Sequence, residues 1–257
     1  MIQVRATDVA TSSDVTRLVQ DVRARADAFV FLSGGASRMS PEARGRVLAL
    51  LDALALLARR GIRFAVGDGG TQAGLMEAAG LVRRVTGGAF PLIGVAPAPD
   101  VTVSGEAGKA PVDPNHSHVI TVENPAWAET RRAEGWKPED GSWGSETVAM
   151  YTIFDRLAAG RPSVAFVANG GAITLDEVRE NLARRRSIVV VAGSGRAADA
   201  IVALLDGTTP NEEETQRLWA RAAALDVPAH RDLFRVIRLE DGPLALAEVL
   251  EDILRRP

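Results

Sequence analysis

The stretch IVVVAGSGR (residues 188–196) joins a run of apolar, mostly β-branched residues to a glycine turn, and this pattern decides the fold. It recurs as FVFLSGGAS (29–37), FAVGDGGT (64–71) and SVAFVANGG (163–171). Continuous runs of Val, Ile and Phe are typical of parallel strands that are buried on both faces. Each glycine turn is therefore expected at the carboxyl end of a strand.

Helical periods separate the apolar runs along the chain. The predicted strands cover 29–32, 62–66, 92–95, 118–122, 163–167 and 188–191, and the predicted helices cover 41–60, 71–82, 146–159, 175–185 and 197–205. Strands that alternate with helices indicate a parallel sheet. We predict an α/β fold with a Rossmann-like, open and mostly parallel sheet, helices on both faces, and a single domain spanning 1–257.

Two regions between and after these elements differ in composition. Residues 97–117 are rich in Pro, Gly and Asp, and residues 126–142 form a second irregular loop beside Trp127, Trp136 and Trp143. A helical extension is expected over 206–257, with a last helix at 244–254 that packs on the core. Capping preferences mark several helix starts. The expected N-caps are Ser40, Ser145, Thr174 and Thr209.

Composition excludes several classes of function. The 257 residues contain no cysteine, so there is neither a disulfide nor a thiolate metal site. The net charge of −3 gives no general attraction to nucleic acid or to an anionic membrane. The apolar runs are too short to span a membrane, and the N-terminus lacks the apolar segment of a signal peptide. We expect a cytoplasmic protein.

The four glycine turns predict one polyanion site. A glycine turn that opens a helix offers amide N–H groups and a positive dipole end, which favour phosphate. In open parallel sheets, ligands bind beyond the carboxyl ends of the strands, so the turns are expected to converge. Asp199 accepts either from a ribose hydroxyl or from its own helix N-terminus. The predicted ligand-binding residues of the turns are Ser33, Gly34, Gly35, Gly69, Gly70, Thr71, Gln72, Gly170, Gly171, Gly193, Ser194, Gly195, Arg196 and Asp199.

Familiar nucleotide motifs are absent. GSGRAAD lacks the third glycine of a G-x-G-x-x-G fingerprint, and no Lys follows a glycine turn as in a P-loop. An ordinary dehydrogenase and a P-loop ATPase are therefore both disfavoured.

Two further motifs contain chemically active side chains. DPNHSH (113–118) places His116 and His118 on one side if the segment is extended. With so few ligands no metal site is predicted, and the histidines either hydrogen-bond a ligand or form a buried structural pair. In WGSET (143–147), Glu146 either contacts ribose, acts as a general acid or base, or caps a helix. His116 and Glu146 are the candidate catalytic residues.

Five motifs together carry a family resemblance: GDGGTQAGLM, LIGVAPAP, DPNHSH, WGSET and VVVAGSGRAADAI. In this order, over about residues 29–205, they resemble the cytosolic N-terminal region of TRPM channels. That region is similar to the SLOG (LSDAT) superfamily, which includes DprA and the LOG enzymes. The chain looks like a free-standing prokaryotic version. The resemblance implies a nucleotide-derived ligand of the ADP-ribose or NAD type, with no other cofactor, and a homodimer; Asn115, His116 and Glu146 match its motifs.

One position departs from the LOG pattern. LOG enzymes have a catalytic Glu in GGxGTxxE, and Gly74 stands at that place here. Glu77 lies one helical turn further on, where it would not reach the same spot. LOG-type phosphoribohydrolase activity is therefore disfavoured.

Three hypotheses remain from the sequence. The first is a binding or sensor protein whose ligand phosphates lie on the glycine turns. The second is an enzyme, an N-glycosidase or hydrolase that acts on NAD, ADP-ribose or a nucleoside monophosphate. The third is a structural partner subunit that interacts through its C-terminal helices.

Overall fold

The computed structural model describes residues 1–35, 40–133, 137 and 141–256. Ala36 and Ser37 of the first glycine turn, and Trp136 of the second loop, lie outside the described residues. No helix in the described part is both long and apolar enough to cross a membrane.

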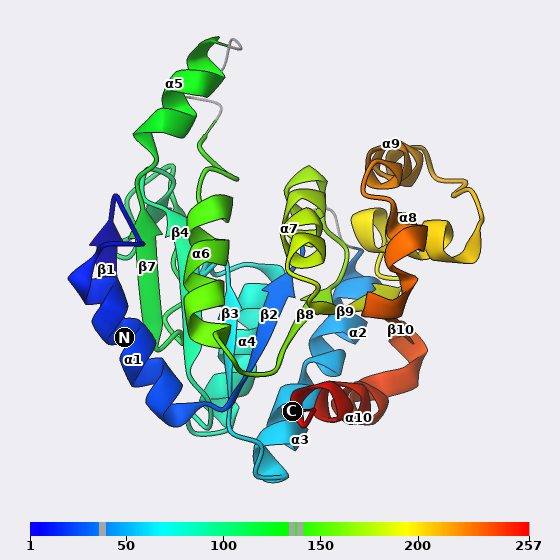
Figure 1. The fold of residues 1–257 in the computed structure, drawn as a ribbon, viewed down its shortest axis with the longest axis horizontal. Helices are drawn as coiled ribbons and strands as arrows, with labels where there is room; N and C mark the ends of the chain where they lie inside the picture. The colour runs from blue at the N-terminus through cyan, green and yellow to red at the C-terminus, as the bar shows by residue number, and fades with distance from the viewer. Residues whose placement is uncertain (36–39, 134–136, 138–140, 257) are drawn as a thin grey trace.

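An eight-stranded sheet with every neighbouring pair parallel forms the centre of the described chain (Figure 1). Its order is β1-β7-β4-β3-β2-β8-β9-β10. The strands are β1 (Ile2–Ala6), β2 (Ala28–Ser33), β3 (Phe64–Asp68), β4 (Leu92–Pro97), β7 (His118–Val122), β8 (Ser163–Val167), β9 (Ser187–Ala192) and β10 (Phe234–Arg238). β5 (Val101–Thr102) and β6 (Ala110–Pro111) form a separate pair. The predicted α/β class and parallel sheet are confirmed.

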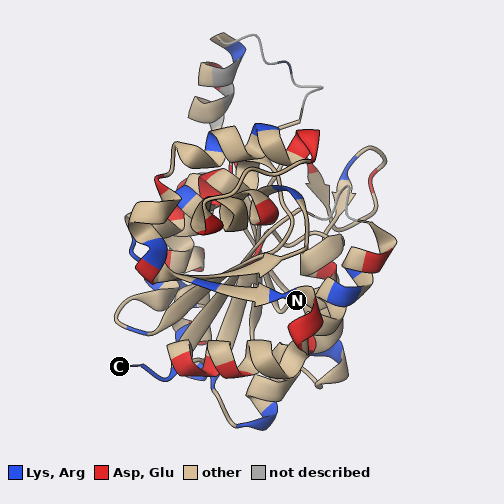
Figure 2. Ribbon diagram, turned by 90° about the vertical axis from the view of Figure 1, so that its right-hand side faces the viewer, with Lys and Arg blue, Asp and Glu red and all other residues tan. Residues whose placement is uncertain are grey.

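Helices cover both faces of the sheet, also as predicted (Figure 1). One layer contains α2 (Pro41–Leu50), α3 (Asp52–Arg59), α4 (Gly74–Val85) and α10 (Gly242–Leu254). The other contains α1 (Ser13–Arg25), α6 (Thr147–Ala158), α7 (Ala172–Ala183), α8 (Arg196–Asp206) and α9 (Glu213–Ala223). α5 (Pro125–Ala133) extends beyond the carboxyl end of β7. Acidic and basic residues are interspersed over the helices (Figure 2).

One large apolar cluster and a small separate one at Ala96 and Val119 lie on one face of the sheet, and two clusters lie on the other. On the face covered by α2, α3, α4 and α10, one cluster runs from Leu92 of β4 to Val191 of β9. On the opposite face, one cluster packs α1 and α6 on β2, and a second packs α7 and α8 on β8 and β9. The two clusters of this face are separated where α6 and α7 meet above the neighbouring strands β2 and β8. Polar side chains fill this boundary, and we call it the seam. Its main side chains are Ser33, Tyr151, Asp155, Asn181 and Arg186.

The structure differs from the sequence prediction in several elements. β1, α1 and β10 were not predicted, and α5 lies where an irregular loop was expected. The C-terminal extension therefore contains a strand as well as helices. The predicted helix 41–60 is divided at Leu51 into α2 and α3, although Ser40 does cap α2 by accepting from Ala43 N–H.

Three of the four expected N-caps are wrong. α6 begins after Glu146, not Ser145, and α7 begins after Gly171. Thr174 instead accepts the Gly171 N–H through its side chain from inside the first turn. α9 begins after Glu212, three residues later than a Thr209 cap would require. In each case the prediction rested on the capping preference of a nearby Ser or Thr, and the helix begins one to three residues away from the expected place.

Candidate functional site

The four glycine turns follow four adjacent strands. GDGGT follows β3, SGG follows β2, NGG follows β8 and GSGR follows β9, in the spatial order β3-β2-β8-β9. The chain proceeds outward from β2 through β3 and β4, then crosses back to β8 and β9, so strand order reverses between β2 and β8. Ligand sites of open parallel sheets lie at such a reversal. The two central turns, SGG and NGG, flank it.

Asn169 joins three of the turns to one another. Its backbone N–H donates to Ser194 Oγ at 2.8 Å, and its side-chain Nδ2 donates to the Gly35 carbonyl at 3.0 Å. The Ser194 hydroxyl in turn donates to the Val191 carbonyl at 2.7 Å. The Ser194 hydroxyl is thus engaged in hydrogen bonds within the protein.

Close packing explains two of the glycines without any ligand. A Cβ on Gly34 would lie 2.2 Å from the Ala168 carbonyl oxygen of the neighbouring strand end. A Cβ on Gly170, which has φ +90°, would lie 2.4 Å from Thr174 Oγ1. These glycines let the ends of β2 and β8 and the start of α7 approach one another.

Arg196 extends from the last turn toward the two central turns. Its Nε donates to Glu214 Oε1 at 2.9 Å, and its terminal nitrogens Nη1 and Nη2 point toward the central turns. A Cβ on Gly35 would be 3.5 Å from Nη1, and a Cβ on Gly171 would be 3.1 Å from Nη2. The guanidinium therefore lies against both central turns, at the reversal of strand order.

Asp199 binds its own turn. Its carboxylate accepts the Gly193 N–H at 2.7 Å and also the Gly195 N–H. Burial raises the pKa of Asp199, and these two amides act in the opposite direction. Of the two roles left open by the sequence, the structure favours the helix N-terminus over a ribose hydroxyl.

Some amides of the outer turns remain available. Among hydrogen bonds between described residues, the N–H groups of Gly69, Thr71, Ser194 and Arg196 have no acceptor. Gly70 N–H donates to Asp68 Oδ1 at 2.7 Å, and Gln72 N–H donates to the Pro111 carbonyl. Each outer turn therefore keeps part of the predicted phosphate cradle and uses the rest internally.

His116 lies underneath the GDGGT turn. Its Nε2 is 2.8 Å from Asp68 Oδ1, and both side chains are fully buried. Burial alone would lower the pKa of His116, but Asp68 and Asp113 outweigh it and raise the pKa to about 9. The raised pKa favours the imidazolium form, and the contact with Asp68 ties the turn to the DPNHSH segment. This contact fits the buried structural role, one of the two that the sequence left open.

The second histidine and Asn115 also serve the fold. His118 is buried, with Nδ1 2.9 Å from Ser117 Oγ and Nε2 3.2 Å from Asp21. The two histidines thus have different partners. The Asn115 N–H donates to Asp113 Oδ1 at 2.6 Å, and its carbonyl accepts from Arg83. No group of three or more His, Cys, Asp or Glu among the described residues has metal-binding geometry.

Two carboxyl groups near the reversal have strongly raised pKa values. Burial raises the pKa of Glu146 to about 7, although its Oε2 accepts the Gly144 N–H at 2.8 Å. Glu177 of α7 was not foreseen. Burial, followed by the charge of Glu146, raises its pKa to about 8, and the Ser33 hydroxyl hydrogen-bonds it. No local pattern in the sequence distinguished Glu177 from a polar side chain on the solvent face of a helix.

The position of the missing LOG glutamate has a distinct backbone. Gly74 is buried and has φ +51°, which disfavours any side chain there. Glu77 pairs with Arg44 of α2 at 3.0 Å, so its carboxylate is held by an arginine of the neighbouring helix. Neither residue supplies the carboxylate of a LOG site.

Comparison with known proteins agrees with this architecture. The family model described as SLOG in TRPM, prokaryote, matches residues 27–243. The chain belongs to this family. The match extends beyond the region 29–205 in which the motifs were recognised, and it includes β10. The SLOG assignment thus covers the whole central part of the sheet.

The remaining comparisons add little to the SLOG assignment. A molybdenum cofactor binding protein from the phototrophic bacterium Rippkaea orientalis has a similar structure, with a TM-score of 0.49 and 14% sequence identity. The alignment covers 89% of this chain and 98% of that one. No curated protein matches the chain.

Proposed function

We propose that this SLOG protein binds a nucleotide derivative of the ADP-ribose or NAD type at the reversal between β2 and β8. The observation that carries the proposal is the Arg196 guanidinium, whose terminal nitrogens lie against Gly35 and Gly171. A planar guanidinium between two glycine turns is suited to a phosphate that needs both backbone approach and charge. Arg196 Nε remains on Glu214, which fixes its orientation.

The flanking groups suit the rest of such a ligand. The acceptor-free amides of Gly69 and Thr71 lie on one side of the reversal and those of Ser194 and Arg196 on the other, so a pyrophosphate has donors on both sides. Glu146 and Glu177 carry carboxyl groups that are partly protonated near neutral pH and can bond sugar hydroxyls as donors or acceptors.

Titration of four ligands tests the proposal. ADP-ribose, NAD, cyclic ADP-ribose and AMP are titrated by calorimetry, and the melting temperature is measured with each. At least one is expected to bind, and Arg196→Gln should weaken it by about tenfold to a hundredfold. Arg17→Gln on the exposed face of α1 is the matched control and should leave affinity unchanged. Absence of binding by all four ligands would refute the proposal.

A second candidate function is hydrolysis of the bound ligand. It is favoured by one observation, that Glu146 and Glu177 have pKa values of about 7 and about 8. A group of this kind can protonate a leaving base while its partner assists the attack of water on the sugar carbon. Chromatography of NAD, ADP-ribose and AMP after incubation separates the two functions. Turnover that is lost in both Glu146→Gln and Glu177→Gln would establish the enzyme.

A further inference from the structure

A cavity of about 360 Å³ lies at the opposite edge of the sheet, where β8 and β9 begin. Ser163 and Ser187, the first residues of these strands, line it. Five arginines line it as well, contributed by three separate segments: Arg161, Arg184, Arg185, Arg186 and Arg256. We call it the arginine pocket. The volume falls within the range of small-molecule sites.

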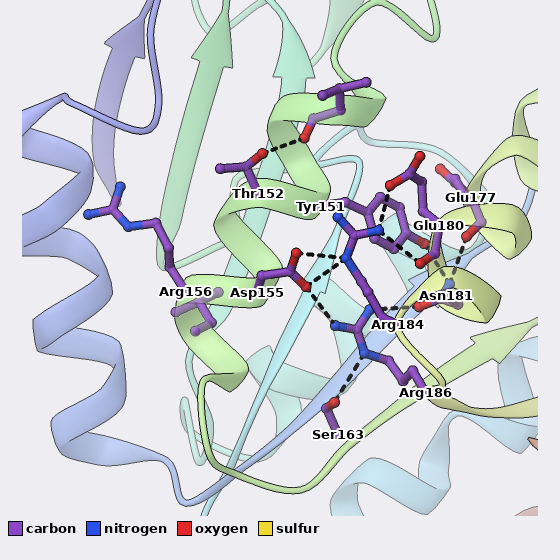
Figure 3. Close-up of polar contacts among 12 residues, drawn as sticks. Tyr151, Thr152, Asp155, Arg156, Ser163, Glu177, Glu180, Asn181, Arg184 and Arg186 are labelled. Atoms are coloured by element: carbon purple, nitrogen blue, oxygen red, sulfur yellow. Dashed lines mark hydrogen bonds and ion pairs between the residues drawn. The ribbon is translucent and has the colours of Figure 1, made fainter.

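The most buried arginine of the pocket is held by the seam (Figure 3). Arg186 donates from Nε to Ser163 Oγ at 3.0 Å and from Nη1 to Asn181 Oδ1 at 2.7 Å. Its Nη2 donates to Asp155 Oδ1 at 3.2 Å. Only 4% of its side chain is exposed. Arg186 is thus a fixed cation at the wall of the pocket.

Arginines outnumber carboxylates among the described residues that line the pocket. Asp155 is the one carboxylate among the described lining residues, and it is shared by Arg184 and Arg186. Arg161 donates to the backbone carbonyls of Arg23 and Ala26 and has no carboxylate within the described part of the chain. Burial, opposed by Tyr151 and Asp155 and assisted by Arg184, lowers the pKa of Arg186, as expected for an under-compensated cation.

Two of the pocket arginines are free to turn toward an anion. Arg185 pairs with Asp232 at 2.9 Å, but both side chains are more than 60% exposed. Arg256 pairs with Asp252 on the exposed last turn of α10. Exposed ion pairs of this kind contribute little to stability. An anion in the pocket can therefore recruit both side chains at small cost.

The backbone at Arg185 has an unusual conformation for an arginine. After the end of α7, Arg185 N–H donates to Leu182 and Arg186 N–H donates to Asn181, and Arg185 has φ +49°. This left-handed position after a helix usually belongs to glycine, because a side chain there is strained. An arginine at this place is not explained by local structure.

We propose that the arginine pocket binds a phosphate-type oxyanion, as a site separate from the nucleotide site at the carboxyl edge. The paired planar forks of Arg184 and Arg186 form the fixed wall, and Arg185 and Arg256 close over the anion. Guanidinium groups bind phosphate in a bidentate manner, which distinguishes this chemistry from a general basic surface.

Inorganic pyrophosphate is the probe, and Arg185→Gly is the deciding variant. Titration is done by calorimetry at 150 mM salt in the Arg196→Gln background, which removes the carboxyl-edge arginine. Arg185→Gly is expected to weaken pyrophosphate binding by about tenfold. Its melting temperature should stay level or rise, since glycine suits the backbone. The affinity loss then has no origin in unfolding.

Two controls make the test decisive. Arg17→Gln removes an exposed charge elsewhere and should leave pyrophosphate affinity unchanged; an equal loss would mean general electrostatics and overturn the proposal. Arg256→Gln should weaken binding in the same sense as Arg185→Gly. The proposal is also overturned if the parent Arg196→Gln protein does not bind pyrophosphate, or if Arg185→Gly binds it as the parent does. None of these outcomes bears on nucleotide binding at the carboxyl edge.

Discussion

The two edges of the sheet are built in different ways. At the carboxyl edge, glycine turns bring the backbone close to the reversal of strand order, and among the described residues Arg196 lies against Gly35 and Gly171. At the amino edge, five arginines are among the residues that line the cavity. The seam between α6 and α7 connects the edges through Ser33, Tyr151 and Asn181.

Because the two edges are built differently, amino-acid substitutions should affect them in different ways. A site made of backbone depends on residues whose lack of a side chain permits close approach, so any added atom disturbs it. A site made of long side chains depends on charge and on the few side chains that are buried. Variants at the two edges should therefore fail for different reasons, steric at one edge and electrostatic at the other.

Gly34→Ala should produce the largest effect, at the carboxyl edge. The added Cβ would lie 2.2 Å from the Ala168 carbonyl oxygen, so the ends of β2 and β8 must separate. We expect a loss of about 3 kcal/mol in the free energy of unfolding, measured by urea denaturation. Gly45→Ala in α2, where a Cβ meets nothing within 4 Å, is the control and should stabilise by about 0.5–1 kcal/mol. Equal stability of Gly34→Ala and wild type would contradict the close packing.

Arg186→Met should produce the next largest effect, at the amino edge. Methionine fills a similar volume but leaves Asn181 Oδ1 and Ser163 without their donor and leaves Asp155 with Arg184 alone. Loss of one partner in a buried network is expected to cost about 2–3 kcal/mol. Arg185→Met, one residue away and exposed, should change stability by less than about 0.5 kcal/mol. Similar losses in both variants would show that Arg186 is not held by the seam.

The sequence predicted the carboxyl edge because its signals are local. Strands β7 and β8 were predicted with their observed bounds, since continuous apolar runs followed by turns identify central parallel strands. The edge strands β1 and β10 were missed for the opposite reason. Exposed Gln3, Arg235 and Arg238 interrupt their apolar pattern, and charged side chains of this kind are common on edge strands.

The seam and the arginine pocket were not predictable in the same way. Glu177, Asn181 and Asp155 lie on amphipathic helices, where polar side chains normally indicate a face in solvent. They are covered because α6 and α7 meet over the junction of β2 and β8, which is a property of the topology. The pocket arginines come from positions nearly 100 residues apart, and no local pattern reports such an assembly.

Glu177→Gln should change stability in a pH-dependent manner. The pKa of Glu177 is about 8 in the folded protein and 4.5 in the reference state, so wild-type stability is full below pH 4.5 and is lost as the pH rises through 8. Glutamine does not ionise. The variant should therefore equal wild type near pH 4, become the more stable of the two as the pH rises from 4.5 to 8, and keep that advantage at pH 9, measured by denaturation across pH.

A control on an exposed carboxylate isolates this pH effect. Glu213→Gln in α9, with 79% of the side chain exposed, should differ from wild type by less than about 0.5 kcal/mol at every pH. If the free energy of unfolding of Glu177→Gln ran parallel to that of wild type across pH, the pKa of Glu177 would not be raised in the folded protein.

Asp199→Asn should have the smallest effect on stability and the most informative effect on binding. Asparagine keeps one oxygen to accept from Gly193 or Gly195, so a loss of about 0.5–1 kcal/mol is expected. The negative charge at the GSGR turn is removed at the same time. If Asp199 occupies donors that a phosphate would otherwise use, ADP-ribose should bind the variant about threefold to tenfold more tightly. Weaker binding would instead place the Asp199 carboxylate on a ligand hydroxyl, and would make the last glycine turn a sugar contact.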